Sequence, residues 1–168
     1  MRSGIEKYSM KKIVGIADME VCNDGQTGLI TYSLGSCIGV AIYDPVAQVG
    51  GLLHYMLPES QIDPQKAQKN PFMFADTGIP LLFKEAYRFG AAKNRIIVKV
   101  AGGSQILDDT GFFNIGKRNY MALRKILWKN NILIKAEDIG GQVSRTVRLD
   151  LATGKVWLKY SGEVEKEL

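Results

Sequence analysis

The first third of the chain is a succession of short β-strand patterns, and this feature restricts the possible folds more than any other. Four runs rich in Val, Ile, Leu and Tyr are separated by glycine, Asp-Pro or polar turns, at residues 13–21, 28–34, 37–43 and 49–56. Helical patterns come only later. Strands in series, followed by strands with helices inserted between them, predict an α+β fold rather than a regular alternation of strands and helices.

Two amphipathic helices are predicted in the second half of the chain. The first has apolar residues at helical spacing, with Asp76 or Thr77 as its N-cap and Gly90 at its end. The second covers residues 116–129, with Asn114 as a candidate cap. Both helices have one apolar face, so we expect each to pack against the strands.

The segments around these helices complete the predicted secondary structure. Further strands are expected at residues 95–101, 132–136, 144–151 and 155–160, the last two forming a hairpin. Residues 58–72 contain three prolines and are predicted to form a loop. The polar tail at 162–168 is expected to fray.

Length and composition are those of one folded domain. The chain has 168 residues, of which 46% are hydrophobic and 23% charged, so we expect a single domain over 1–168 with an ordered core at about 13–160. The net charge of +5 is spread in ones and twos, which favours an acidic protein partner and no nucleic acid. No apolar run could act as a signal core or span a bilayer, so we expect a cytoplasmic protein without membrane insertion.

The cysteine and histidine content limits the metal chemistry that the chain could perform. Cys22 and Cys37 are not in a Cys-x-x-Cys spacing, and His54 is the only histidine. In a reducing cytosol both cysteines are expected to be free thiols, with Cys22 in a structural role. We expect no metal site and no cofactor.

Cys37 and His54 lie on two runs that can pair as a hairpin. If the turn places Tyr43 opposite Gln48, Cys37 faces His54 directly, with Cβ atoms roughly 4.5–5.5 Å apart. A bulge at the glycine pair 50–51 would slip this register and separate the two side chains. The spacing therefore permits a thiol–imidazole pair.

Such a pair would need His54 to take the thiol proton, because the strand-like sequence after Cys37 offers no helix N-terminus to stabilise a thiolate. A third group should hold the imidazole ring. The hydroxyl of Thr31 or of Ser33 could accept the imidazole N–H. Asp44 is the nearest acidic residue, but it lies at the far end of the predicted hairpin.

The tight turn at Gly35 and Ser36 could bind substrate together with Ser33, since its backbone N–H groups are available to a developing oxyanion. Structural roles for Cys37 and His54 also remain open. A single cysteine on a strand is usually a small buried hydrophobic residue, and a lone histidine is usually exposed or a hydrogen-bonded core residue. Spacing alone favours these structural roles.

Neither of two glycine-rich turns has the sequence of a phosphate-binding loop. Residues 102–104 (Gly-Gly-Ser) follow a strand but have neither the GxGxxG nor the GxxxxGK[ST] spacing. They predict a tight turn or a close approach of two backbones, and the pair Gly140–Gly141 predicts the same.

Two elements of the chain resemble the CheD family of chemoreceptor glutamine deamidases: LGSC at 34–37, followed by GGLLHYMLP at 50–58. Further resembling segments lie at 94–106, 115–119 and 135–160. The resemblance implies a layered α+β fold, with a mixed or antiparallel β core and flanking helices, shared with deamidating bacterial toxins. It also implies that residues 114–119 lie on the side of the active site.

The activity that the resemblance implies is cysteine-dependent hydrolysis of glutamine side-chain amides on methyl-accepting chemotaxis receptors. Cys37 matches the nucleophile, His54 the general base and acid, and Thr31 the residue that orients the histidine. Hydrolysis of glutamate methyl esters at the same site is a related expectation. Two alternatives stay open: a regulator that docks the chemotaxis phosphatase CheC, with catalysis secondary, and a redox sensor that uses Cys37.

Overall fold

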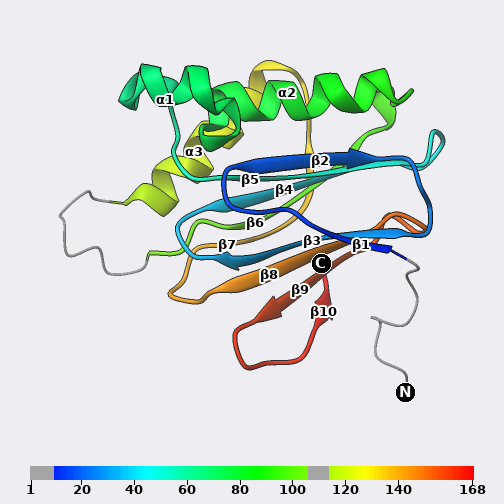
Figure 1. Cartoon of the computed structure of the whole chain (residues 1–168). Helices are drawn as coiled ribbons and strands as arrows, with labels where there is room; N and C mark the ends of the chain where they lie inside the picture. Colours follow the sequence, from blue (N-terminus) through cyan, green and yellow to red (C-terminus); the bar gives the residue numbers. More distant parts are fainter. Residues whose placement is uncertain (1–9, 106–113) are drawn as a thin grey trace.

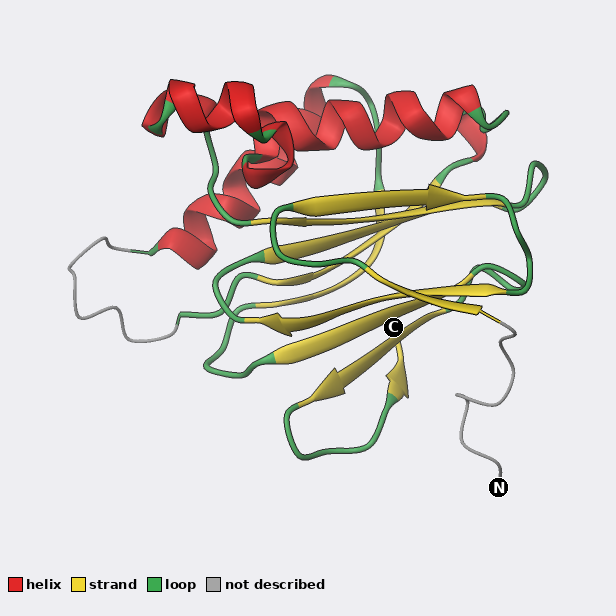
Figure 2. Cartoon of the chain, in the orientation of Figure 1, coloured by secondary structure: helices red, strands yellow, loops and turns green. Residues whose placement is uncertain are grey.

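The structure is a computed structural model that describes residues 10–105 and 114–168. It has three layers: helices cover one face of a β-sheet, and a second β-sheet packs on the opposite face of the first (Figures 1 and 2). Both sheets combine antiparallel and parallel pairs, since β1 runs parallel to β3 and β6 runs parallel to β7. The predicted α+β class with a mixed β core is confirmed.

The outer sheet has the strand order β1-β3-β8-β9-β10, and the middle sheet has the order β2-β5-β4-β6-β7. The strands of the outer sheet are β1 (Met10–Ile13), β3 (Thr27–Leu34), β8 (Arg145–Asp150), β9 (Val156–Tyr160) and β10 (Lys166–Glu167). Those of the middle sheet are β2 (Asp18–Cys22), β5 (Val49–Tyr55), β4 (Ile38–Asp44), β6 (Ile97–Gly102) and β7 (Ile134–Ile139). The helices are α1 (Pro64–Lys69), α2 (Ala75–Arg88) and α3 (Ile115–Lys129), with 3₁₀ turns at Ser60–Ile62, Pro71–Met73 and Lys93–Arg95.

The middle sheet is buried on both faces, and the alternation along its strands divides the core in two. In β4, Val40 and Ile42 face the helices and belong to one core cluster. Ala41 and Tyr43 face the outer sheet and belong to a second cluster between the two sheets. Every residue of β4 is therefore buried, and residues 38–43 form an unbroken apolar run that ends at the buried carboxylate of Asp44.

The chain passes from the outer sheet to the middle sheet at residues 35–37, between β3 and β4. These three residues are half-buried, whereas Leu34 and Ile38 on either side are fully buried. The crossing therefore brings Cys37 to the boundary between the two sheets, where it packs against the inter-sheet cluster.

Several predicted boundaries are corrected by the structure. The run at 13–21 is two strands with a bend between them, and residues 58–72 contain α1 and two 3₁₀ turns rather than only loop. Helix α2 begins at Ala75, with Phe74 in the N-cap position and no side-chain cap, so Asp76 and Thr77 lie inside its first turn.

The prediction that the C-terminal tail frays is wrong. Lys166 and Glu167 form β10 against the edge of β9, and the main-chain N–H of Leu168 donates to the carbonyl of Val156. Glu165 also forms a 2.6 Å ion pair with Arg148. The tail is polar because its side chains at 161–167 are all exposed, and its main chain is held by the sheet edge.

No helix in the described parts of the chain is long and apolar enough to cross a membrane.

Candidate active site

The β4–β5 hairpin has a register different from the predicted one. Gly39, not Cys37, lies opposite His54, and Tyr43 lies opposite Gly50 rather than Gln48. The expected direct pairing of Cys37 with His54 is therefore wrong by two residues. A shift of two residues keeps every side chain on its original face, so Cys37 remains a diagonal neighbour of His54 on the inter-sheet side.

The turn explains the shifted register. The Asp44 carboxylate accepts hydrogen bonds from the N–H groups of Val46 and Ala47, at 2.9 and 3.1 Å, and Gln48 adopts a left-handed conformation with φ of 55°. These contacts keep the loop at four residues but move it one position along the chain, from 44–47 to 45–48, so that Asp44 pairs with Val49.

The glycine pair at 50–51 forms no bulge, because β5 pairs with β2 and β4 without a break. A Cβ atom on Gly50 would lie 2.1 Å from a methyl group of Leu151 in the segment after β8, and one on Gly51 would lie 2.9 Å from a methyl group of Leu82 on α2. The two glycines therefore allow β5 to pack closely against its neighbours on both faces.

Thr31 and His54 are joined by a buried hydrogen bond across the gap between the two sheets. The hydroxyl oxygen of Thr31 lies 2.7 Å from Nδ1 of His54 and 2.7 Å from the carbonyl oxygen of Val14. A carbonyl can only accept, so the single hydroxyl hydrogen of Thr31 goes to Val14, and its oxygen accepts the N–H from Nδ1. The hydrogen-bond network thus fixes the tautomer and leaves the Nε2 lone pair unprotonated.

His54 lies in a strongly desolvated position. Its side chain and that of Thr31 are both inaccessible to solvent, and burial lowers the pKa of His54 from 6.5 to about 4. Nε2 has no hydrogen-bond partner among the described residues. The imidazole is therefore neutral at physiological pH, with one free acceptor atom.

Cys37 is a half-buried neutral thiol. Burial raises its pKa to about 11, and a smaller opposing effect comes from its own backbone N–H. Because Nε2 of His54 is without a partner, the thiol and the imidazole are not hydrogen-bonded to each other in this structure. Cys37 and Cys22 are both free thiols.

The loop that carries Cys37 is held by the end of β6. The main-chain N–H of Gly103 donates to the Cys37 carbonyl at 2.9 Å, and that of Ser104 donates to the Gly35 carbonyl at 2.8 Å. Gly102 has φ of 122°, and a Cβ atom there would lie 2.2 Å from the Cys37 carbonyl oxygen. The predicted close approach of two backbones at residues 102–104 is confirmed.

Neither nearby carboxylate holds the imidazole. Asp44 binds Arg95 at 3.0 Å; burial alone would raise the pKa of Asp44, but hydrogen bonds from Arg95 and from main-chain N–H groups lower it to about 2. Asp18 lies opposite His54 across the β2–β5 pair, but its carboxylate accepts a hydrogen bond from the N–H of Met19. Of the two candidate hydroxyls, Thr31 contacts the ring, whereas Ser33 is exposed and left-handed, with φ of 59°.

A buried residue that the sequence did not single out lies beside the site. Asn119 on α3 donates through Nδ2 to the carbonyl of Ser36 at 2.9 Å and to that of Met56 at 2.8 Å. The only signal in the sequence was its place in the segment 115–119. This contact brings α3 against the Cys37 loop, as the resemblance implied for that segment.

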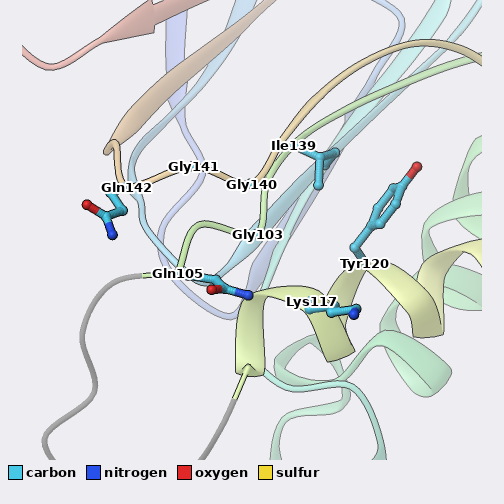
Figure 3. A pocket seen from close by; sticks show the side chains of 8 residues that line it. All are labelled: Gly103, Gln105, Lys117, Tyr120, Ile139, Gly140, Gly141 and Gln142. Atoms are coloured by element: carbon cyan, nitrogen blue, oxygen red, sulfur yellow. The ribbon is translucent and has the colours of Figure 1, made fainter.

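A pocket of about 340 Å³ lies next to Gly103, between the start of α3 and the turn at 140–141 (Figure 3). The three candidate catalytic residues are not among the described residues that line it. The pocket therefore lies beside the support of the Cys37 loop rather than at the thiol.

Fold and side chains together define a layered α+β protein that carries a thiol, an imidazole and a hydroxyl between its two sheets. These are the groups that thiol-dependent acyl transfer requires. The chain belongs to the CheD family: the family model described as "CheD chemotactic sensory transduction" matches residues 56–160.

Curated relatives match over nearly their whole length. A protein of Syntrophus aciditrophicus is 60% identical over 156 residues, covering 93% of this chain and 98% of the relative, and is named "Probable chemoreceptor glutamine deamidase CheD 1". Two further relatives are named "Probable chemoreceptor glutamine deamidase CheD". The one from Solibacter usitatus is 54% identical and covers 93% of this chain and 92% of the relative. The one from Pyrococcus horikoshii is 42% identical and covers 89% of this chain and 93% of the relative. The matches to these relatives cover 89–93% of this chain and therefore include the segment that contains Thr31, Cys37 and His54.

Proposed function

We propose that this chain is a chemoreceptor glutamine deamidase in which Cys37 is the nucleophile, His54 the general base and acid, and Thr31 the residue that orients the imidazole. The observation that carries the assignment is the Thr31–His54 hydrogen bond, which leaves Nε2 as the only proton acceptor of the ring. The names of the relatives supply the reaction and the substrate class.

The resting site holds a neutral thiol and a neutral imidazole. With a thiol pKa of about 11 and an imidazole pKa of about 4, an ion pair does not form before substrate binds. Proton transfer from Sγ to Nε2 therefore accompanies the attack of sulfur on the substrate carbonyl.

The reaction proceeds in two halves. Sγ of Cys37 attacks the side-chain carbonyl carbon of a receptor glutamine, and its proton goes to Nε2 of His54. The imidazolium then protonates the amide nitrogen, ammonia leaves, and a thioester remains. In the second half, His54 takes a proton from water, the resulting hydroxide attacks the thioester, and the Cys37 thiol is released with glutamate as product. A glutamate methyl ester presents the same acyl carbon, so the site also hydrolyses such esters.

The protein partner is the cytoplasmic helical region of the receptor. An exposed groove along α3 is lined by four cationic residues, and Glu59 is the one acidic residue among those that line it. The groove also contains two exposed apolar side chains, Met121 at 56% and Trp128 at 79%. Such a face suits an acidic amphipathic helix, and the cations accelerate encounter in a salt-dependent way.

The experiment is to incubate a chemoreceptor cytoplasmic fragment with wild type, Cys37→Ala or His54→Ala, and to measure ammonia release and the masses of the receptor peptides. We expect wild type alone to convert glutamine to glutamate. Equal ammonia release by all three proteins would show that the assigned residues are wrong. A Cys37→Ala protein that still alters the activity of CheC would favour the alternative role as a regulator of that phosphatase.

A further inference from the structure

Each main-chain carbonyl of the loop 35–37 is held by a donor from outside the loop. The carbonyls of Gly35 and Cys37 accept from main-chain N–H groups at the end of β6, at 2.8 and 2.9 Å. The Ser36 carbonyl accepts from Nδ2 of Asn119 at 2.9 Å. Asn119 is thus the one side chain among these three donors, and it is the donor that mutation can remove.

Holding the carbonyls also fixes the N–H groups of the same peptide units. In a planar trans peptide, the C=O and N–H bonds point in opposite directions. The bond to the Gly35 carbonyl therefore turns the Ser36 N–H away from β6, and the bond to the Ser36 carbonyl turns the Cys37 N–H away from α3. The Cys37 N–H is oriented so that it stabilises its own thiolate. The Cys37 N–H, which the bond from Asn119 orients, therefore lies on the side of the thiol from which Cys37 would attack a carbonyl.

We propose that Asn119 is a positioning residue for an oxyanion hole formed by the backbone N–H groups of Ser36 and Cys37. The inference rests on the proposed deamidase function and adds a residue to it. Asn119 does not touch the substrate. Its role is to hold the Ser36–Cys37 peptide in the one orientation that points a donor at the developing negative charge.

The surroundings of Asn119 suit this role. Its side chain is fully buried, and Nδ2 also donates to the carbonyl of Met56, two residues after His54. The hydroxyl of Tyr55 donates a hydrogen bond to the main-chain carbonyl of Asn119 at 2.7 Å. One amide group therefore ties the nucleophile loop to the end of the strand that carries the base.

The amide is also a poor choice for stability alone. Two carbonyl acceptors around one terminal atom require an NH₂ group there, so an aspartate cannot replace it. Oδ1 of Asn119 is buried and has no partner among the described residues, which destabilises the fold. The two bonds that Nδ2 makes therefore come with the cost of a buried oxygen that has no partner, and stability alone does not explain an asparagine at this position.

The test compares Asn119→Ala and Asn119→Asp with wild type on a chemoreceptor fragment. We expect kcat for ammonia release to fall about 100-fold, with KM within about twofold, because a misdirected donor affects only the transition state. Alkylation of Cys37 by iodoacetamide should stay within about twofold of wild type, because displacement of iodide at a saturated carbon develops no oxyanion. Asn130→Asp is the matched control, since Asn130 lies exposed just after the same helix and its Nδ2 donates to the Ile126 carbonyl; its kcat should equal that of wild type.

A fall in kcat with unchanged alkylation supports the inference. An unchanged kcat overturns it, and so does a parallel loss of kcat and alkylation, which indicates general collapse of the loop. If neither variant folds, Asn119→Ser is used: its hydroxyl oxygen ends one bond short of the Nδ2 position and cannot hold the Ser36 carbonyl, so kcat should fall here too, and a wild-type kcat in it overturns the inference. If wild type releases no Cys37-dependent ammonia, the proposed function itself is wrong, and this inference is wrong with it.

Discussion

Replacing Thr31 by valine removes the hydroxyl that holds the His54 ring and keeps the size of the side chain. Two hydrogen bonds are lost, each 2.7 Å long and fully buried: the bond to the Val14 carbonyl and the bond from Nδ1 of His54. Leaving a buried donor or acceptor without a partner costs roughly 1–3 kcal/mol each. We therefore expect Thr31→Val to lower the free energy of unfolding by about 2–6 kcal/mol and the Tm by roughly 4–24 °C.

The effect on catalysis is separate from the effect on stability. Without the acceptor at Nδ1, the imidazole proton can move to Nε2, and that tautomer cannot take a proton from Cys37. Loss of tautomer control in a Ser-His-Asp triad lowers kcat about 10⁴-fold, and because a hydroxyl is uncharged we expect a smaller loss of about 10²–10³-fold here. Ammonia release should be measured well below the Tm of the variant, so that all of the protein is folded.

The same strand contains a matched control. Thr27 on β3 is also fully buried, but its hydroxyl has no partner among the described residues. Thr27→Val should therefore leave kcat unchanged and should not lower the Tm. Thr31→Ser keeps the hydroxyl and should retain most of the activity. The reasoning is refuted if Thr31→Val keeps more than half of the wild-type kcat, or if Thr27→Val loses as much as Thr31→Val.

Four further outcomes are expected. The pKa of His54 is lowered to about 4, so between pH 4 and 6.5 the unfolded chain binds a proton that the native protein does not, and stability should rise with pH across this window. In thermal melts at several pH values, this rise should be smaller for His54→Gln than for wild type. Alkylation of Cys37 should keep increasing with pH toward its pKa of about 11, with no plateau at pH 5–8 of the kind an ion pair would give. Arg118→Glu with Lys125→Glu should raise KM for the receptor fragment and weaken its salt dependence at unchanged kcat. Arg145→Lys should lower the free energy of unfolding by about 2–3 kcal/mol in denaturant titrations, because the buried guanidinium contacts four groups that an ammonium cannot reach together.

Two controls accompany the surface and core variants. Lys155 and Lys159 are exposed on the outer sheet, and their reversal to glutamate should leave KM unchanged. A larger KM in that variant would mean that net charge, and not the α3 groove, governs binding. Arg88 pairs with Glu85 at the surface of α2, and Arg88→Lys should change stability by less than about 0.5 kcal/mol.

The faces of the β4–β5 hairpin could be predicted from the sequence because they depend on local alternation. The predicted register was wrong, yet Cys37 and His54 still share a face, since the error was an even number of residues. The register itself depends on Asp44, whose carboxylate is bound by the N–H of Ala92 and by Arg95, residues 48 and 51 positions away. A short-range pattern contains no information about those contacts.

The support of the site could not be predicted for the same reason. Asn119 meets Ser36 across 83 positions of the chain, and Thr31 meets Val14 through a bend that a single predicted strand at 13–21 would not contain. Ser33 and Thr31 were equivalent candidates in the sequence. They differ in the structure because the β3–β8 pairing shifts between Thr31 and Leu34, which leaves Ser33 exposed.

Burial of His54 has opposite effects on the two halves of the proposed reaction. An imidazole with a pKa of about 4 is a weak base, so the resting thiol stays protonated and poorly reactive toward small electrophiles. The same low pKa makes the imidazolium, once formed, a strong acid next to the departing nitrogen. An amide nitrogen leaves only when it is protonated, so the acid half benefits most from the buried position. The Thr31 hydrogen bond ensures that this proton is held at Nε2, the atom from which it can reach the leaving group.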